Sequence, residues 1–189
     1  MASGVSDGFQ SLGREIGWEG RIIQAGVERF RHADGSESVR DKVWHPGAVG
    51  IIPLDGDTVW LTRQPREVVG ARASLEIPAG KLDVAGEGPL ATAQRELAEE
   101  IGKRAQSWRE VFDFYASGGF CDERIWLFLA IGLSDADETG TPAHEEDERI
   151  TAIRWPLSEL DAAIAETHDA KTLIALLWLA RHVDQGLSL

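Results

Sequence analysis

The pattern of hydrophobic and polar positions predicts a chain of short β-strands interleaved with helices. The weak alternation from Trp18 to Val43, broken by the turn residues Ala33-Asp34-Gly35-Ser36, predicts a strand pair or a small sheet. By contrast, residues 1–17 are rich in Ser and Gly, and we expect them to be partly loose. Short apolar runs between turn residues predict further strands at residues 47–53, 59–62, 74–78, 111–115, 125–133 and 150–155.

Three segments have the features of helices. Pro89 suits the first turn of a helix, apolar residues then recur on one face, and Gly102 is a suitable stop. A second helix is expected from Ser158, and residues 170–183 form a strongly apolar closing helix. The glycine-rich residues 80–88 predict a loop. Because strands and helices are interleaved in one chain, we expect an α/β sandwich.

Composition narrows the classes of function. The 189 residues include 19 Lys and Arg against 32 Asp and Glu, a net charge of −13. This charge argues against binding of nucleic acid or of an anionic membrane surface, although carboxylates can hold a phosphate through a metal cation. No apolar run approaches the ~18 residues of a membrane span, and the first ten residues lack the pattern of a signal peptide. Together with the single cysteine, Cys121, these features predict a cytoplasmic protein.

The segment from Arg95 to Gly102 contains an unusual cluster of carboxylates. On a helix, Glu96 lies three residues from Glu99 and four from Glu100, so that the three side chains are neighbours and repel one another. A solvated helix face is one interpretation of this cluster. A site for a hard cation such as Mg²⁺ is the other, because Mg²⁺ prefers oxygen ligands and is often shared with substrate phosphates.

The spacing of these residues resembles the Nudix box. The matching positions are Gly80, Glu87, Arg95-Glu96-Leu97, Glu99-Glu100 and Gly102. Two positions depart from the family pattern: the segment from Gly80 to Glu87 is one residue longer, and Lys103 stands where an apolar residue is expected. Glu87 has two candidate roles, to orient Arg95 or to favour the N-terminus of the helix through its dipole.

The resemblance implies an α/β/α sandwich with a mixed sheet, and Mg²⁺-dependent hydrolysis (or Mn²⁺-dependent hydrolysis) of a nucleoside diphosphate linked to another group. It implies an N-terminal antiparallel β extension at residues 1–44 and a hydrolase domain at residues 45–189. By motif match, Glu96 and Glu100 would be the main metal ligands, and the carbonyl of Ala79 would be a further ligand. Glu99 would be a ligand or a nearby support, and with Arg95 it is counted among the catalytic residues. Glu87 and Arg95 would shape the loop and helix.

Residues outside the box are similar to the ADP-ribose pyrophosphatase branch of the family. They are His45-Pro-Gly-Ala-Val49, Leu61-Thr-Arg-Gln-Pro-Arg66, Leu75-Glu-Ile-Pro-Ala-Gly-Lys-Leu-Asp83 and Ser117-Gly-Gly-Phe-Cys-Asp-Glu123. Pro65 replaces the aromatic residue of the branch, and Gly118 replaces a proline that marks preference for ADP-ribose. ADP-ribose or a related nucleotide sugar is therefore the expected substrate. Other dinucleotides, GDP sugars and a non-catalytic nucleotide-binding module remain as alternatives.

Four residues are candidates for binding this substrate, and each has a second interpretation. Arg66 offers a guanidinium fork for phosphate or ribose, or else forms a surface ion pair. Glu76 binds ribose or adenine, or else pairs with a nearby arginine. Trp18 stacks on a base, or else fills a core or an interface, and Arg40 is a weaker candidate of the same kind.

The family often takes its catalytic base from a loop outside the box. The acidic residues 144–149 form the candidate loop, with Glu146 and then Glu148 as the expected base, and a solvated loop as the alternative. The branch usually forms homodimers, and the segment from Trp18 to Val43 suits a contact between subunits.

Overall fold

The computed structural model describes residues 8–136 and 149–183, and the chain separates into two compact units. The smaller unit contains the chain up to Gly47 together with Tyr115–Arg124. The larger unit contains Ala48–Phe114 and the chain from Ile125 onwards. The helices and every residue of the carboxylate cluster belong to the larger unit.

The smaller unit is built on an antiparallel sheet of three strands, β1 (Phe9–Glu19), β2 (Gln24–His32) and β3 (Glu37–Trp44). The predicted N-terminal sheet is therefore confirmed, but the expectation of a loose segment up to residue 17 is wrong from Phe9 onwards. Phe9 lies opposite His32 in the sheet and packs edge-on against Phe30, with ring centroids 5.4 Å apart. These contacts between strands fix a segment whose own composition favours no regular structure.

The larger unit contains a mixed sheet in the order β10-β5-β4-β9-β8, with β6 paired to β5 and β7 paired to β4. Strands β4 and β9 run parallel, whereas β5, β6, β7 and β10 join by antiparallel pairing. Two expectations need correction: the loop predicted at residues 80–88 begins with a short strand, and the strand predicted at residues 111–115 begins at Lys103. The strands are β4 (Ala48–Asp55), β5 (Thr58–Arg66), β6 (Ala71–Glu76), β7 (Ala79–Lys81), β8 (Lys103–Tyr115), β9 (Arg124–Asp135) and β10 (Thr151–Pro156).

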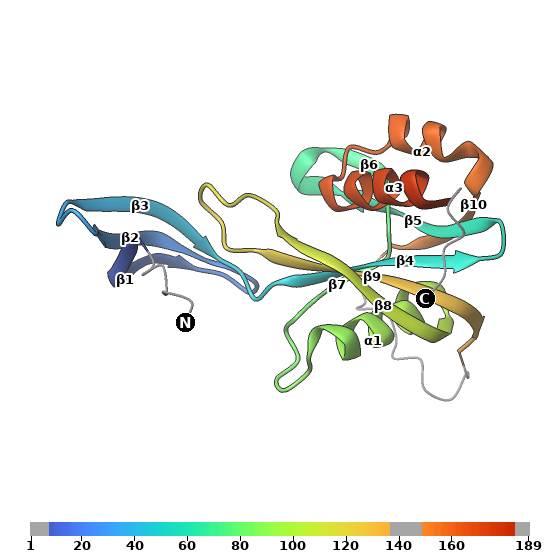
Figure 1. The fold of residues 1–189 in the computed structure, drawn as a ribbon, viewed down its shortest axis with the longest axis horizontal. Coiled ribbons are helices and arrows are strands. Elements are labelled where there is room, and N and C mark those ends of the chain that lie inside the picture. Colours follow the sequence, from blue (N-terminus) through green and yellow to red (C-terminus); the bar gives the residue numbers. More distant parts are fainter. Residues whose placement is uncertain (1–7, 137–148, 184–189) are drawn as a thin grey trace, which may run out of the picture. The chain divides into compact units, whose positions relative to one another are not determined.

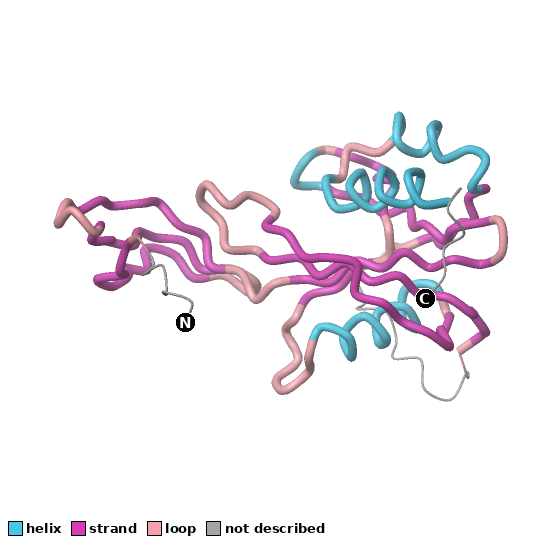
Figure 2. Tube along the Cα trace, in the orientation of Figure 1, coloured by secondary structure: helices cyan, strands magenta, loops and turns pink. Residues whose placement is uncertain are grey.

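Helices cover both faces of the larger unit's sheet. Helix α1 (Pro89–Ile101) lies on one face, and α2 (Leu160–Glu166) and α3 (Ala170–His182) lie on the other (Figures 1 and 2). Single 3₁₀ turns occur at Glu67–Val69 and Leu157–Glu159. The predicted α/β/α sandwich is thus confirmed. Within the described part of the chain, no helix combines the length and the apolar character needed to cross a bilayer.

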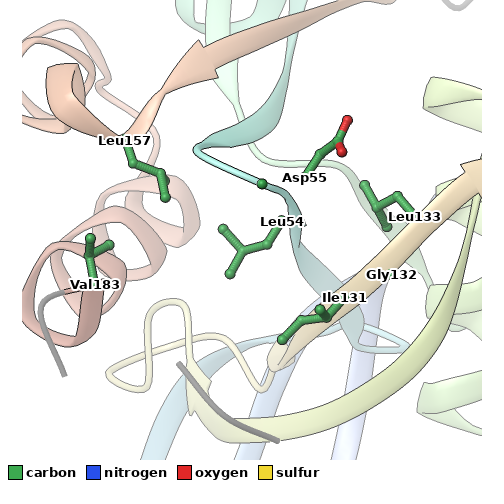
Figure 3. Close-up of a pocket in the computed structure, with 8 residues that line it drawn as sticks. Leu54, Asp55, Ile131, Gly132, Leu133, Leu157 and Val183 are labelled. Atoms are coloured by element: carbon green, nitrogen blue, oxygen red, sulfur yellow. The ribbon is translucent and has the colours of Figure 1, made fainter. Parts of the chain in front are cut away.

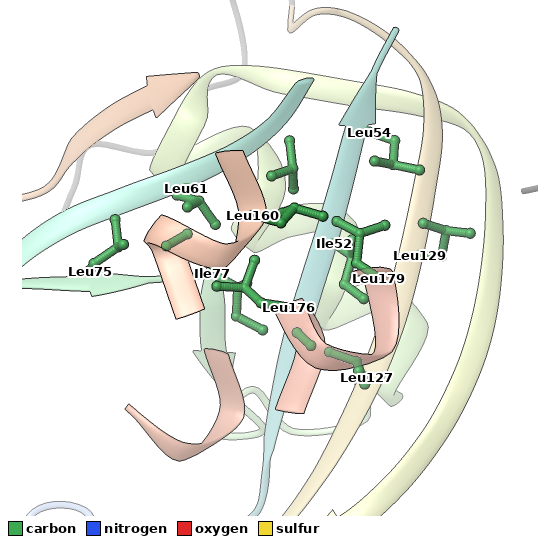
Figure 4. Close-up of a cluster of buried hydrophobic side chains, with 13 residues drawn as sticks. Ile52, Leu54, Leu61, Leu75, Ile77, Leu127, Leu129, Leu160, Leu176 and Leu179 are labelled. Atoms are coloured by element: carbon green, nitrogen blue, oxygen red, sulfur yellow. The ribbon is translucent and has the colours of Figure 1, made fainter. Parts of the chain in front are cut away.

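The core explains why β4 and β9 read as continuous apolar runs. Successive side chains of a strand point to opposite faces, so a strand buried on both faces is apolar throughout. In β4, Val49 and Ile51 pack beneath α1, whereas Ile52 and Leu54 pack beneath α2 and α3. Figure 4 shows the second cluster, which is formed by Ile52, Leu54, Val59, Leu61, Leu75, Ile77, Leu127, Leu129, Leu160, Ala163, Ala175, Leu176 and Leu179.

Candidate metal and substrate site

Helix α1 presents the carboxylate cluster, and its two ends follow the sequence prediction. Pro89 occupies the first turn, where its missing N–H has no partner to lose. Gly102 adopts the left-handed conformation with φ of 64°, and its N–H donates a hydrogen bond to the carbonyl of Ala98. This conformation ends the helix. The apolar face buries Ala93 and Leu97 completely against the sheet. The remaining faces carry the acidic residues.

Arg95 lies at the centre of three carboxylates. Its Nη1 donates to Glu96 Oε1 at 2.7 Å and to Glu99 Oε2 at 2.9 Å, and its Nε lies 3.2 Å from Glu87 Oε2. Burial alone would lower the pKa of Arg95, but the bond to Glu87 and the charges of Glu96 and Glu99 raise it above its usual value. Arg95 and Glu99, four residues apart on the helix, thus form an ion pair. Of the two candidate roles of Glu87, contact with Arg95 is the one that the geometry shows directly.

Glu96 and Glu100 reach the same short piece of backbone from one helix. The buried Glu100 accepts a hydrogen bond from the N–H of Ala79 at Oε2, with a length of 3.1 Å. A Cβ placed on Gly80 would lie 2.0 Å from Cδ of Glu96, so the Glu96 carboxyl packs directly on the bare Cα of this glycine. The two side chains, one helical turn apart, therefore converge on the pair Ala79-Gly80.

This donor set has the chemistry of a hard-cation site. Carboxylates from Glu96, Glu99 and Glu100 and the backbone of Ala79 supply only oxygen ligands. The described residues include no group of three or more His, Cys, Asp or Glu side chains already gathered as a metal cage. Mg²⁺ does not require such a cage, since it keeps several waters and shares substrate phosphates. The residues present therefore fit a cation that binds together with its substrate.

Beside the box, Glu76 at the end of β6 forms ion pairs with two cations. Its carboxylate is 1% exposed and accepts Nε and Nη2 of Arg66, each at 2.7 Å, as well as Nζ of Lys171. Burial alone would raise the pKa of Glu76, but the bond from Arg66 and the charge of Lys171 outweigh it and lower the pKa to about 2. Glu76 also raises the pKa of Arg66, and Asp169 and Glu100 add to this increase, which places Arg66 within electrostatic reach of the carboxylate cluster.

The sequence interpretation missed Lys171 and Asp169. Asp169 caps α3 by accepting from the N–H of Thr172 at 2.9 Å, and it also pairs with Lys171. The residues Asp-Ala-Lys-Thr at the start of an apolar helix are a recognisable N-cap signal, because an N-cap Asp accepts the backbone N–H of the residue three positions later. That signal predicts a helix start and does not reveal a partner of Lys171 elsewhere in the chain.

The remaining candidates are not among the larger unit's residues described above. Trp18 and Arg40 belong to the smaller unit. Trp18 is 56% exposed, so it does not fill a core of this chain, and Arg40 lines a cavity of about 320 Å³ together with Phe9, Phe30, Tyr115 and Phe120. Glu146 and Glu148 lie outside the described residues.

A cavity of about 440 Å³ lies at the far end of β4 from the Ala79-Gly80 contact. Its lining is mainly apolar, as Figure 3 shows, and includes Leu54, Ile131 and Leu157. Its one carboxylate, Asp55, lies 3.4 Å from Nη2 of Arg154. Its described lining residues include no Lys or Arg, and none of them is a candidate site residue.

Comparison with known proteins identifies the fold that carries the cluster. The model of the NUDIX domain matches residues 44–177, which is more than half of the chain. The chain belongs to the Nudix family. The resemblance inferred from the box is therefore confirmed, and the contacts of Arg95, Glu96 and Glu100 are contacts within a Nudix domain.

This Nudix chain is similar in sequence to three bacterial proteins of known name. The ADP-ribose pyrophosphatase of Mycobacterium tuberculosis is 37% identical over 80% of this chain and 72% of its own length. The ADP-ribose pyrophosphatase of Bacillus subtilis is 35% identical over 90% of this chain and 91% of its own length. The methanol dehydrogenase activator of Bacillus methanolicus is 36% identical over 86% of this chain and 87% of its own length. A solved structure described as an ADP compounds hydrolase has a TM-score of 0.79 over 97% of this chain and 99% of its own, and at 22% identity it supports the fold.

Proposed function

We propose that this protein hydrolyses the pyrophosphate bond of ADP-ribose or a related nucleoside diphosphate sugar, with Mg²⁺ as the cation and Mn²⁺ as a substitute. The observation that carries the proposal is the convergence of Glu96 and Glu100 on Ala79-Gly80. The two relatives named ADP-ribose pyrophosphatase support the choice of substrate.

In this reaction one water adds to a phosphorus atom of the diphosphate and the bridging P–O bond breaks. From ADP-ribose the products are AMP and ribose 5-phosphate. Glu96, Glu99, Glu100 and the carbonyl of Ala79 would hold the cation, which when bound neutralises phosphate charge and lowers the pKa of a bound water. Arg95 keeps Glu96 and Glu99 in place. Either Glu146, our first choice, or Glu148 would accept the proton of the attacking water.

Arg66 is the proposed phosphate-binding residue of the larger unit. Its Nε and Nη2 face Glu76, while its side chain is 44% exposed, so Nη1 remains available to an anion. Of the two interpretations of Glu76, the ion pair is the one for which the geometry gives direct contacts. Trp18 and Arg40 remain proposed contacts for the base or ribose.

We also propose a homodimer in the cytoplasm that acts on a small molecule and binds neither nucleic acid nor membrane. Every described strand residue of the three-stranded sheet is at least partly exposed. Among them are the large side chains of Phe9, Trp18 and Val39. Because three strands gain independent stability from a covered apolar face, a second subunit would stabilise this sheet. The net charge of −13 supports the exclusion of nucleic acid.

The experiment is to incubate the protein with ADP-ribose and Mg²⁺ and to follow AMP by chromatography, with EDTA as the metal-free control. Turnover that requires the cation and is lost in Glu100→Gln supports the proposal. Failure to cleave any member of a panel of dinucleotides and nucleotide sugars, with Glu96 and Glu100 intact, would overturn it.

Regulation of a dehydrogenase is the second candidate function, because a relative of 36% identity is named a methanol dehydrogenase activator. It predicts an increased dehydrogenase rate when the protein is added. The substrate panel distinguishes it from the first proposal, since a purely regulatory module would bind nucleotide without cleaving it.

A further inference from the structure

The corner between α2 and α3 makes several polar contacts with the strand that leads into the Nudix box. Its side chains form hydrogen bonds or an ion pair with three consecutive residues at the end of β6, Leu75, Glu76 and Ile77. This segment continues after Pro78 into Ala79, whose N–H is held by Glu100. The corner contacts are Thr167 Oγ1 to the carbonyl of Leu75 at 2.9 Å, Lys171 Nζ to Glu76 Oε2 at 2.5 Å, and the N–H of Ile77 to Thr172 Oγ1 at 2.8 Å.

Lys171 is the one cation among these corner residues, and its side chain is 12% exposed. Its ammonium lies between two carboxylates, Glu76 and Asp169, at 2.5 and 2.9 Å. Asp169 is itself fixed by the N–H and the hydroxyl of Thr172. Lys171 therefore connects the rigid start of α3 to the carboxylate that holds Arg66.

We infer that Lys171 is a positioning residue for substrate binding: it fixes the Glu76 carboxylate so that Arg66 presents its free Nη1 edge to the diphosphate. The inference rests on the proposed function, because it takes Arg66 to bind the substrate. A carboxylate held by one arginine alone can rotate with its partner, whereas a second donor on the same oxygen fixes its plane. A buried carboxylate that loses one of two cations also draws the remaining one more closely.

The first test compares Lys171→Met with Lys171→Arg in steady-state hydrolysis of ADP-ribose. We expect the Met variant to raise KM about 10-fold with kcat within about 2-fold, and the Arg variant to restore most of the affinity. Lys171→Gln, which keeps a hydrogen-bond donor without the charge, replaces the Met variant if that variant does not fold. Glu166→Gln is the matched control, because it removes the ion pair of Glu166 with Arg63, which joins β5 to α2 without touching Glu76.

The second test is a double-mutant cycle with Arg66→Met. If Lys171 acts through Arg66, the double variant has the same KM as Arg66→Met alone, within about 2-fold. Additive effects on KM would overturn the inference, and so would a lower kcat and melting temperature in Lys171→Met without a change in KM. A parent protein that cleaves no ADP-ribose overturns the proposed function, whereas an active parent and an unaltered Lys171→Met variant overturn the role of Lys171 alone.

Discussion

Replacement of Gly80 by alanine tests whether the position of Glu96 is essential. The new Cβ would lie 2.0 Å from Cδ of Glu96, and an ordinary carbon contact is about 3.5–4.0 Å. The Glu96 carboxyl must therefore retreat by roughly 1.5 Å, which exceeds the ~0.2 Å tolerance of a metal–ligand distance. We expect kcat/KM for Mg²⁺-dependent ADP-ribose hydrolysis to fall at least about 100-fold, which equals about 2.7 kcal/mol of transition-state stabilisation.

The stability of Gly80→Ala should change far less than its activity. Gly80 has no positive φ, so alanine fits the backbone and gains about 0.4–1 kcal/mol from the unfolded state. Rotation of Glu96 gives up its partly exposed bond to Arg95, at a cost of about 1 kcal/mol. Thermal unfolding should therefore show nearly unchanged stability. Gly88→Ala is the control, since its Cβ meets nothing within 4 Å. If Gly80→Ala keeps kcat/KM within about 3-fold of the parent, the position of Glu96 is not essential and our assignment is wrong.

Three other changes follow from the same structure. Glu100→Gln, which keeps the shape and an acceptor for the backbone, should lower kcat by about 100-fold or more in the AMP assay, and near-parental turnover would exclude Glu100 as a ligand. Leu176→Ala, at a position 1% exposed, should cost about 2–5 kcal/mol in urea unfolding, whereas Leu177→Ala, at a position 52% exposed, should cost less than about 0.5 kcal/mol. Equal costs would place the core of α3 elsewhere. The pKa of Glu76 is about 2 in the folded protein against an ordinary 4.5, so its contribution of ~3 kcal/mol is complete above about pH 4.5 and is lost as the pH falls toward 2. Urea unfolding at pH 7 and pH 3 should therefore show a larger loss for the parent than for Glu76→Gln, and equal losses would contradict the assigned pKa.

The elements of the larger unit could largely be predicted because their signals are local. Helix α1 has a proline at its start and a left-handed glycine at its end, and β4 is apolar on both faces. Three strands were missed or shortened, and for β7 and β1 partners distant in the sequence decide the structure. Strand β7 forms because Ala79 to Lys81 pair with β4, and β1 forms because Phe9 and its neighbours pair with β2. Pairing of this kind leaves no periodicity within the segment itself.

The carboxylates of the site could be predicted for a related reason, since spacing on a helix determines which side chains are neighbours. Contacts between elements could not. Glu76 also pairs with Lys171, which lies 95 residues further along the chain and gives no signal near Glu76 in the sequence. Likewise, the need for glycine at position 80 depends on Glu96, which only the packing of α1 against β7 reveals.

The charge distribution of the site accounts for a phosphate-binding function in a protein of net charge −13. On α1, the single guanidinium of Arg95 pairs with the carboxylates of both Glu96 and Glu99. One positive charge does not balance two negative charges, so negative charge remains for a cation to neutralise. On the side of β6, Arg66 keeps an exposed positive edge although Glu76 is buried against it. A metal–diphosphate complex carries both signs of charge and is therefore complementary to both parts of the site. A free cation would match only the carboxylates of α1, and a free anion would match only Arg66.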